Sequence, residues 1–185
     1  LPSQMHWLMI ASAYTLVFFL LEDLSRFCLH VCMHRFPLLW KMHRVHHSAT
    51  LLTPLTLHRV HPIEMVIYYL RGLLVFGIVS GTFVYMYGRS LSGLDILGVD
   101  ALGFLFNIVG ANLRHSSIYI GFGRFERWFI SPAQHQLHHS SSPMHYGRNY
   151  GTCLAVWDRV YKSWLPAAGN EIRAYGIPKG HGTLG

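Results

Sequence analysis

Three groups of histidines in this sequence have a spacing that would project several imidazole rings from one face of a helix. The first group holds two histidines four residues apart, and the other two groups share the pattern His-x-x-His-His. Residues three and four apart lie on the same helical face, so each group could bind a metal ion from one side. The groups are His30 and His34; His43, His46 and His47; and His135, His138 and His139.

The number of imidazoles predicts a site for two metal ions. Neutral imidazole binds zinc, iron, copper and nickel, and eight imidazoles exceed the four ligands of a structural zinc ion. Pro37 separates the first two groups, so they should occupy two helical segments that can face each other. His138 and His139 are adjacent, and their rings would diverge by about 100° on a helix. They therefore suit two different ions, or one ion and a contact beside it, better than one ion together.

The elements that carry these groups are predicted to be helices. The apolar run from Met5 to Leu21 should form a helix that continues past Glu22 and Asp23 as far as His34. The third group follows Ser131-Pro132-Ala133-Gln134, which has the pattern of a capping box with proline at the first helical position. A helix that begins there would hold the third group in its first turns.

The composition favours a membrane protein. Apolar residues make up 51% of the chain and charged residues only 12%, against about a quarter in soluble domains. The runs Met5–Leu21, Met65–Tyr87 and Leu94–Gly110 approach the roughly 20 residues that cross a hydrocarbon core. We therefore predict an all-α integral-membrane helical bundle with a helical cap that holds the di-metal site. A large buried helix bundle is the alternative.

The charge pattern predicts the orientation of the bundle. The net charge is +7, but no dense basic patch with a nucleic-acid-binding motif is present, so we expect anionic lipid rather than nucleic acid as a partner. If the second and third runs both cross, every histidine group lies on one side. All 15 Lys and Arg residues except Arg71 and Arg89 also lie there. The positive-inside rule makes that side cytoplasmic, with the turn 88–93 opposite, in the bacterial inner membrane or the endoplasmic reticulum.

Two shorter features add to this interpretation. Aromatic residues alternate with charged ones from Phe122 to Phe129, which predicts a segment at the membrane interface. Cys28, Cys32 and Cys153 are too few for a disulfide framework, and we expect them to be small buried residues, with metal binding as the alternative.

Six segments together resemble the fatty acid hydroxylase and sterol desaturase superfamily of integral-membrane di-iron enzymes. They are HVCMH (30–34), HRVHH (43–47), RVHPIE (59–64), NLRH (112–115), SPAQHQLHH (131–139) and NYG…WDR (149–159). The resemblance implies that the eight grouped histidines and His115 are iron ligands. His61, Asn112 and His145 are further candidates for ligands or for contacts beside them. Relatives tend to carry a histidine where this chain has Ser117, which leaves the second iron with fewer ligands.

The resemblance also implies a domain organisation and a reaction. Residues 1–165 would form the membrane di-iron domain and 166–185 a Gly-rich tail; because the chain begins at Leu1 rather than Met, we expect further sequence upstream. Two iron ions would use O2 to hydroxylate or desaturate a sterol, fatty-acyl or related lipid. Zinc could replace iron in purified material.

Electrons for such a reaction must come from another protein. The sequence has no haem-binding His-Pro-Gly-Gly, no Gly-rich dinucleotide motif and no iron–sulfur cysteine set. A cytochrome b5-like protein, a ferredoxin or a flavoprotein reductase is therefore the expected donor. The alternative function is that of a membrane zinc-dependent hydrolase or a metal-binding or transport protein. The absence of His-Glu-x-x-His argues against a zinc protease, and histidines at the ends of the apolar runs argue against a carrier.

Overall fold

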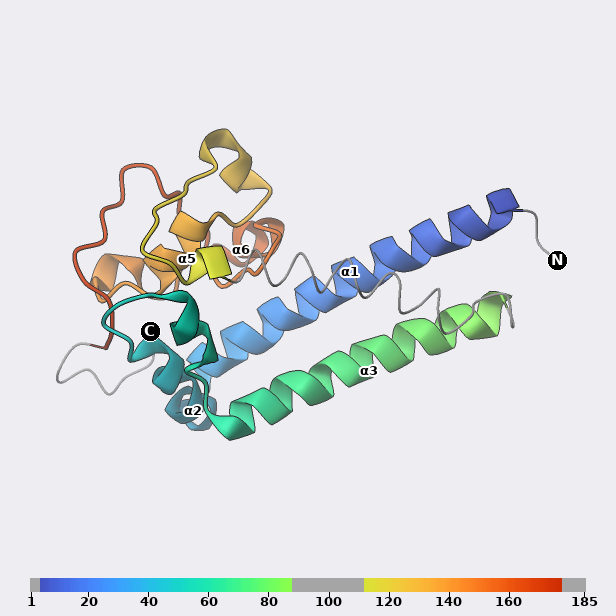
Figure 1. Ribbon diagram of the computed structural model, residues 1–185, viewed down its shortest axis with the longest axis horizontal. Coiled ribbons are helices and arrows are strands. Elements are labelled where there is room, and N and C mark those ends of the chain that lie inside the picture. Colours follow the sequence, from blue (N-terminus) through green and yellow to red (C-terminus); the bar gives the residue numbers. More distant parts are fainter. Residues whose placement is uncertain (1–3, 88–111, 178–185) are drawn as a thin grey trace.

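Two long helices and a compact cap make up the computed structural model, which describes residues 4–87 and 112–177. Helix α1 spans Gln4–Arg35, α2 spans Pro37–His47 and α3 spans Pro62–Tyr87. Figure 1 shows α1 and α3 side by side, with the cap at the end where α1 finishes and α3 begins. The described residues contain helices and two isolated β-bridges but no strand, so the predicted all-α fold is confirmed.

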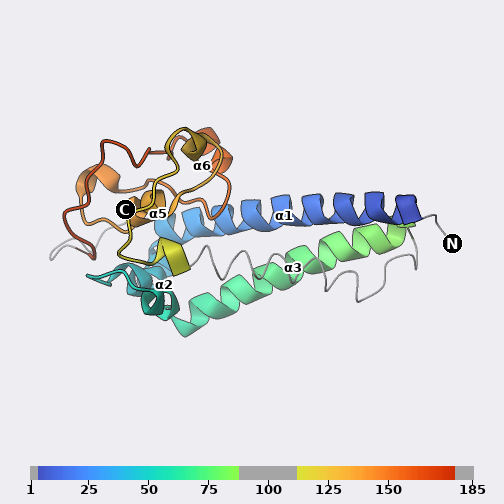
Figure 2. The same ribbon diagram turned by 45° about the horizontal axis from the view of Figure 1, so that its top comes forward.

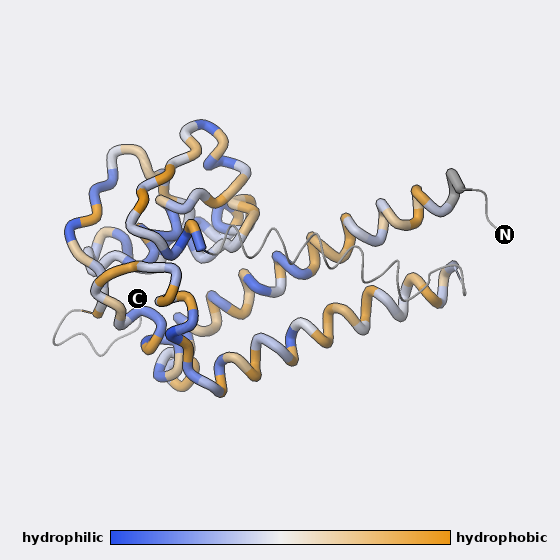
Figure 3. The backbone as a smooth tube through the Cα atoms, viewed as in Figure 1, coloured by the Kyte–Doolittle hydropathy of each residue, from blue (hydrophilic) through white to orange (hydrophobic). Residues whose placement is uncertain are grey.

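Helices α1 and α3 are each long and apolar enough to cross a membrane. The candidate spans are Trp7–Arg35 and Pro62–Tyr87. Of the residues in the most apolar part of each span, only 11% and 17%, respectively, are buried within the protein. Most of their apolar side chains therefore face outward, as they would toward lipid, and Figure 3 shows hydrophobic residues along both helices. The predicted third run, Leu94–Gly110, and the turn 88–93 lie outside the described residues.

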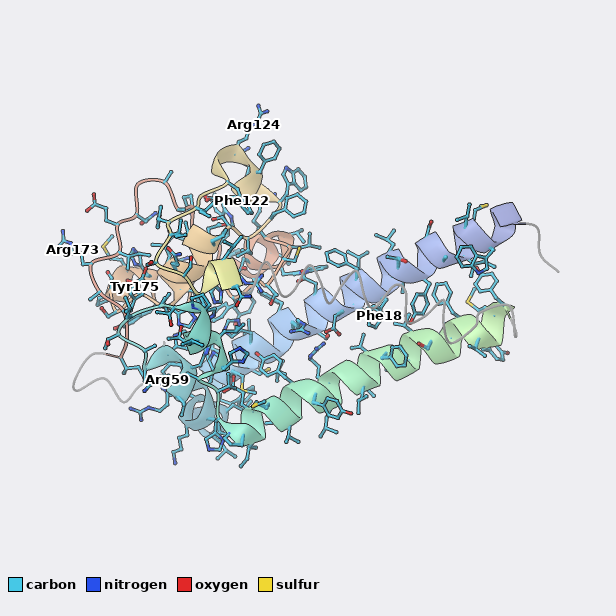
Figure 4. All side chains as sticks on the ribbon, in the orientation of Figure 1. Phe18, Arg59, Phe122, Arg124, Arg173 and Tyr175 are labelled. Carbon is cyan, nitrogen blue, oxygen red and sulfur yellow. The ribbon has the colours of Figure 1, made fainter. Side chains whose placement is uncertain are left out.

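The two long helices contact each other through one apolar and one polar group. Tyr14 packs edge-to-face on Phe83 and its hydroxyl lies 3.0 Å from the Ser80 hydroxyl. Phe18 lies between the helices and contacts the ring of Phe76 (Figure 4). Near the cap, Arg71 of α3 forms an ion pair with Glu22 of α1 at 2.7 Å. These contacts hold the two apolar helices in one register.

The continuation of α1 beyond Glu22 and Asp23 is confirmed, because the helix ends only at Arg35. Its C-terminal part lies beside the cap, as Figures 1 and 2 both show. Phe36 is extended and Pro37 begins α2, so the chain bends between the two helices where Pro37 predicted a break. Cys28 is exposed rather than buried as predicted. It lies two residues before His30, about 200° around the helix, and so faces away from the cap.

The cap is built from short helices. They are the 3-10 helices η1 (Pro54–His58), η3 (Gly123–Arg127) and η4 (Pro143–His145) and the α-helices α5 (Pro132–His138) and α6 (Val156–Tyr161). The capping box predicted for α5 is present, because the Ser131 hydroxyl accepts from the Gln134 N–H while the Gln134 side chain accepts from the Ser131 N–H. Every residue of α5 is buried, so the cap encloses this helix.

Two buried carboxylates fasten the cap. Asp23 of α1 accepts hydrogen bonds from the backbone N–H groups of Cys153 and Leu154 and from the Trp157 indole, all at 2.9–3.0 Å. Asp158 of α6 accepts from the N–H groups of Tyr150 and Gly151 at 2.7–2.8 Å. Asp23 thus joins α1 to a segment 130 residues later in the sequence, and Asp158 fixes the loop before α6.

Residues 166–177 pack on the cap. Ala167 is buried against Ala133 and Leu137 of α5, and its N–H donates to the buried Glu126 carboxylate at 2.9 Å. The division of the chain at residue 165 stays a prediction. The segment 122–129 contains η3, and its aromatic residues Phe122, Phe125, Trp128 and Phe129 are all exposed, as an interfacial segment requires. Figure 4 shows Phe122 and Arg124 at the outer edge of the cap.

Candidate metal centre

Nine histidines converge where the end of α1, helix α2 and helix α5 meet. All nine are buried. Helix α1 supplies His30 and His34, α2 supplies His43, His46 and His47, and α5 with its C-terminal cap supplies His135, His138 and His139. The ninth, His115, follows the short helical turn 112–114. These are the eight grouped histidines of the sequence together with the one that only the family resemblance indicated.

The nine histidines divide into two groups. We call His30, His34, His43, His47 and His138 the five-histidine group, and His46, His115, His135 and His139 the four-histidine group. Within each group, one candidate ligand nitrogen from every residue lies within 4.8 Å of all the others. The groups adjoin, since the rings of His47 and His139 stack at 4.3 Å between centroids. The adjacent residues His138 and His139 belong to different groups.

The distances between ring nitrogens fit metal ligation. Nε2 of His43 lies 3.2 Å from Nε2 of His47, and Nε2 of His135 lies 3.0 Å from Nε2 of His115 and 3.2 Å from Nε2 of His139. A zinc–imidazole bond is about 2.0–2.1 Å, so two ligands at a right angle would have nitrogens about 2.9 Å apart. The spacing is therefore close to that of neighbouring ligands on one ion.

Several buried imidazole nitrogens have no hydrogen-bond partner. Both ring nitrogens of His34 and Nε2 of His138 are in this state, although they are shielded from water. Leaving a buried polar atom unpaired costs about 1–3 kcal/mol. A metal ion would satisfy Nε2 of His138 and one of the two ring nitrogens of His34, and imidazole is the ligand type that iron and zinc both accept.

Hydrogen bonds from the opposite ring nitrogens orient the five-histidine group. Nδ1 of His30 donates to the Tyr150 carbonyl at 2.7 Å, and Nδ1 of His138 donates to the Arg148 carbonyl at 2.7 Å. Each bond fixes the tautomer that leaves Nε2 free to bind a metal ion, which is the usual arrangement around metal-bound histidine.

A third such bond comes from a residue that the sequence analysis missed. Nδ1 of His43 donates to Oε1 of Glu64 at 2.6 Å, and the Glu64 side chain is buried. In the sequence, Glu64 resembles an ordinary acid in the first turn of a helix. The signal that could have found it is its place in the segment RVHPIE, three residues after His61.

Burial keeps the clustered histidines neutral. It lowers the pKa of His46 to about 4 and that of His115 to about 3. Burial, reinforced by neighbouring imidazoles, also lowers the pKa values of His47, His135 and His139 well below 6.5. Only neutral imidazole offers a lone pair to a metal ion, so the site favours the ligand form at neutral pH.

The weaker candidates from the sequence lie outside both groups. Nδ1 of His61 accepts from the Ile63 N–H at 3.2 Å and thereby caps α3. Asn112 is half-buried, and His145 is buried and hydrogen-bonds the Asn170 side chain. Ser117, which stands where relatives tend to have histidine, is exposed. The four-histidine group thus has one imidazole fewer than its neighbour.

Comparison with known proteins places this arrangement in a family. The model of the family described as fatty acid hydroxylase matches residues 15–163, which include every histidine of both groups. The chain belongs to the fatty acid hydroxylase family. The resemblance found in the sequence motifs is thereby confirmed. Together with the two apolar helices, membership of this family of membrane enzymes indicates an integral membrane protein.

Relatives of this fatty acid hydroxylase family member include three alkylglycerol monooxygenases. The one from Danio rerio is 25% identical over 166 residues, covering 90% of this chain and 33% of the relative. The one from Caenorhabditis elegans is 22% identical over 94% of this chain and 31% of the relative, and that from Xenopus tropicalis is 23% identical over 86% and 32%. The chain thus spans about a third of these relatives. No solved structure matches it significantly.

Proposed function

We propose that this chain holds the di-iron centre of a membrane monooxygenase that oxidises an alkyl chain of a lipid. The observation that carries the proposal is the pair of adjacent, buried histidine groups in a cap at the end of two outward-facing apolar helices. Apolar helices offer a lipid an approach from the membrane, and the histidines lie at their cap end. The proposed iron ligands are the nine histidines of the two groups.

The chemistry follows from the substrate class. An alkyl C–H bond has no acidic proton and no leaving group, so side-chain acids and bases cannot cleave it. When bound, two iron ions would supply the oxidising power from O2. The overall reaction R–H + O2 + 2 electrons + 2 protons gives R–OH + H2O. The chain's own part is to keep the imidazoles neutral, to fix their tautomers through Tyr150, Arg148 and Glu64, and to exclude water by burial.

The relatives refine the substrate and the outcome. Three of them are named alkylglycerol monooxygenases, which favours hydroxylation over desaturation and makes an alkylglycerol the first substrate to test. Electrons would come from an external one-electron donor. The histidine cap would face the cytoplasm, in the bacterial inner membrane or the endoplasmic reticulum.

The test is to follow the oxygen atom and the metal together. Protein purified anaerobically with iron should contain two iron ions per chain. It should convert an alkylglycerol in the presence of a reductant, with 18O from labelled O2 in the product. A single metal ion with full activity would exclude the di-iron centre. Label arriving from H218O would instead support the zinc-dependent hydrolase, and zinc in an inactive preparation would decide nothing about the native metal because imidazole binds both ions.

A further inference from the structure

A chain of packed aromatic rings connects the five-histidine group to the protein surface. The ring of Tyr150 lies 5.1 Å from that of His34 and 5.5 Å from that of His138, between centroids. On its other side, the Tyr150 ring lies 6.2 Å from that of Tyr161. Tyr161, at the end of α6, is 41% exposed whereas Tyr150 is 1% exposed. One buried ring therefore separates the histidines from a ring that a partner protein can touch.

Tyr150 is held rigidly in this position. Its N–H donates to Asp158 and its carbonyl accepts from His30. Its hydroxyl is buried and has no hydrogen-bond partner. The residue therefore serves the histidine group through its backbone, while its ring fills the space between that group and Tyr161.

The exposed end of this chain lies away from the membrane. Asp23 marks the end of the apolar run of α1, and the helix advances about 18 Å from Asp23 to Arg35. Tyr161 contacts α1 on the cap side of Asp23, at the Phe27 ring (5.9 Å between centroids) and at Arg35. By contrast, the exposed Trp128 lies nearer the apolar run. Its carbonyl accepts a hydrogen bond from the N–H of Ala155, and the neighbouring Leu154 is bound to Asp23 at the end of that run. A water-soluble partner can reach Tyr161.

The surface around Tyr161 is basic. The Arg35 guanidinium lies 5.8 Å from the centre of the Tyr161 ring. Arg148 donates to the carbonyl of the exposed Lys162 at 3.1 Å, so these two residues adjoin the end of α6 as well. Among the described residues, the only exposed acid is Glu171. This surface therefore attracts a partner that carries negative charge.

We propose that Arg35, Arg148, Tyr161 and Lys162 form the docking surface for an acidic one-electron carrier protein, and that Tyr161 and Tyr150 lie on its electron route to the five-histidine group. The proposal rests on the proposed function and names the partner of the same site. Each turnover takes two electrons, one from each of two reduced carriers, and two protons from water. The carrier is oxidised, and one atom of O2 is reduced to water.

The experiment measures the rate at which a reduced carrier delivers electrons to the iron-loaded protein, by anaerobic stopped-flow spectroscopy. The probe is the soluble haem domain of cytochrome b5, an acidic one-electron carrier. The second-order rate constant should fall steeply with ionic strength. In the double variant Arg35→Glu/Lys162→Glu it should fall about tenfold at low salt, because steering charges change association rates by that order or more. The single variant Lys162→Gln should show a smaller loss of the same kind.

The matched control is the double variant Arg124→Glu/Arg173→Glu, which makes the same change of charge at exposed arginines elsewhere on the cap (Figure 4). Both double variants are compared with the unaltered protein at the same ionic strengths; the control should lose less than the docking variant at low salt and should stay within about twofold of the unaltered protein at 0.15 M salt, where the Debye length is about 8 Å. An equal loss in both double variants would show a general effect of net charge and would overturn the docking surface.

A second readout separates the route from the docking. Tyr161→Leu should slow electron delivery at saturating carrier while leaving the half-saturating carrier concentration unchanged, and Tyr161→Phe should restore the rate. Unchanged delivery in Tyr161→Leu would remove Tyr161 from the route. Iron content should be unaffected in every variant, and oxidation driven by dithionite in 1 M salt should be unaffected in the charge variants, since charges there act only within about 3 Å. If dithionite supports no lipid oxidation in the unaltered protein, the proposed function fails; if it does and the charge reversals change nothing, only the docking proposal fails.

Discussion

His43 and Glu64 form a buried pair in which the imidazole Nδ1 lies 2.6 Å from the carboxylate Oε1. The two residues come from α2 and α3, so the helix that continues into the second apolar span also orients a proposed ligand of the five-histidine group. The second carboxylate oxygen, Oε2, has no hydrogen-bond partner. A carboxylate–histidine–metal arrangement raises the basicity of the ligand and fixes its ring, and at the proposed metal site it would give Glu64 a role without contact with the metal.

Replacing Glu64 should therefore weaken metal binding at one group only. In Glu64→Ala, the affinity of the five-histidine group should fall by about 10–100-fold, the usual effect of removing such a partner. In Glu64→Gln the loss should be smaller, because the amide oxygen still accepts from Nδ1. Metal content after dialysis against a graded chelator should approach one ion per chain in Glu64→Ala and stay at two in the exposed control Glu171→Gln. Equal retention of both ions in all three proteins would remove Glu64 from the site.

His138 and His139 should have equal importance for different reasons, because the structure places them in different histidine groups. Each change to Ala should reduce the metal content toward one ion per chain. Lipid oxidation should fall by more than the roughly 10–100-fold typical of outer partners, while the protein stays in the membrane fraction because the apolar helices do not depend on α5. The exposed His58→Ala is the control and should retain activity. Spectroscopy of the ion that remains in each variant shows which ion was lost. Loss of the same ion from both variants would contradict the division into two groups.

Much of the site could be predicted from the sequence because helical spacing is a local property. The i, i+3, i+4 pattern alone placed eight histidines on three helical faces, and Pro37 and the Ser131–Gln134 box marked where two of those helices begin. Both helix starts are as predicted. The assignment of each histidine to a group needs the crossing of α1, α2 and α5 in space, which spacing within one helix does not contain.

Contacts between distant segments could not be predicted for the same reason, because local spacing does not contain them. Asp23 looks like a simple end to an apolar run, yet it binds the backbone 130 residues later. Cys28 resembles a buried small residue by type and is exposed because of its helical face. By its position in the helix alone, Glu64 could not be told from an acid that only stabilises a helix N-terminus, because both roles use the same position.

Gly151 should be irreplaceable, because its backbone passes close to three groups. A Cβ atom at this position would lie 2.7 Å from Oδ2 of Asp158, 2.9 Å from Cγ1 of Ile130 and 2.9 Å from the Leu154 carbonyl. Gly151→Ala should destabilise the cap by about 1–3 kcal/mol, as overpacking does, and should also displace Tyr150, whose carbonyl orients His30. The control Gly77→Ala has open space around its Cβ in α3 and should be neutral or stabilising by up to about 1 kcal/mol. Thermal unfolding followed by circular dichroism, with metal content, measures both; an unchanged Tm for Gly151→Ala would show that the loop can move aside.

The orientation of the cap can be tested by cysteine labelling in sealed vesicles. Ser142 lies on the cap beside α5, and the positive-inside rule predicts that it faces the cytoplasm, opposite residue 90 in the predicted turn. In a background with Cys28→Ser, since Cys28 is exposed, Ser142→Cys should react with a membrane-impermeant maleimide only from the cytoplasmic side. Ser90→Cys should react only from the other side. Labelling of both from one side would exclude the predicted pair of crossings.

The metal-free cap should be destabilised by mild acid. Burial lowers the pKa of His46 to about 4 and that of His115 to about 3, whereas in the unfolded chain both titrate near 6.5. Between these values the unfolded chain binds more protons than the folded one, so the stability of the metal-free protein should be highest above about pH 6.5 and should fall as the pH drops toward 4. Bound metal holds the same nitrogens unprotonated and stabilises the folded state. The Tm of the metal-free protein should therefore fall between pH 7.5 and pH 5, and at pH 7.5 it should lie below the Tm of the iron-loaded protein. An unchanged Tm of the metal-free protein over this pH range would mean that the folded cap does not keep these imidazoles neutral.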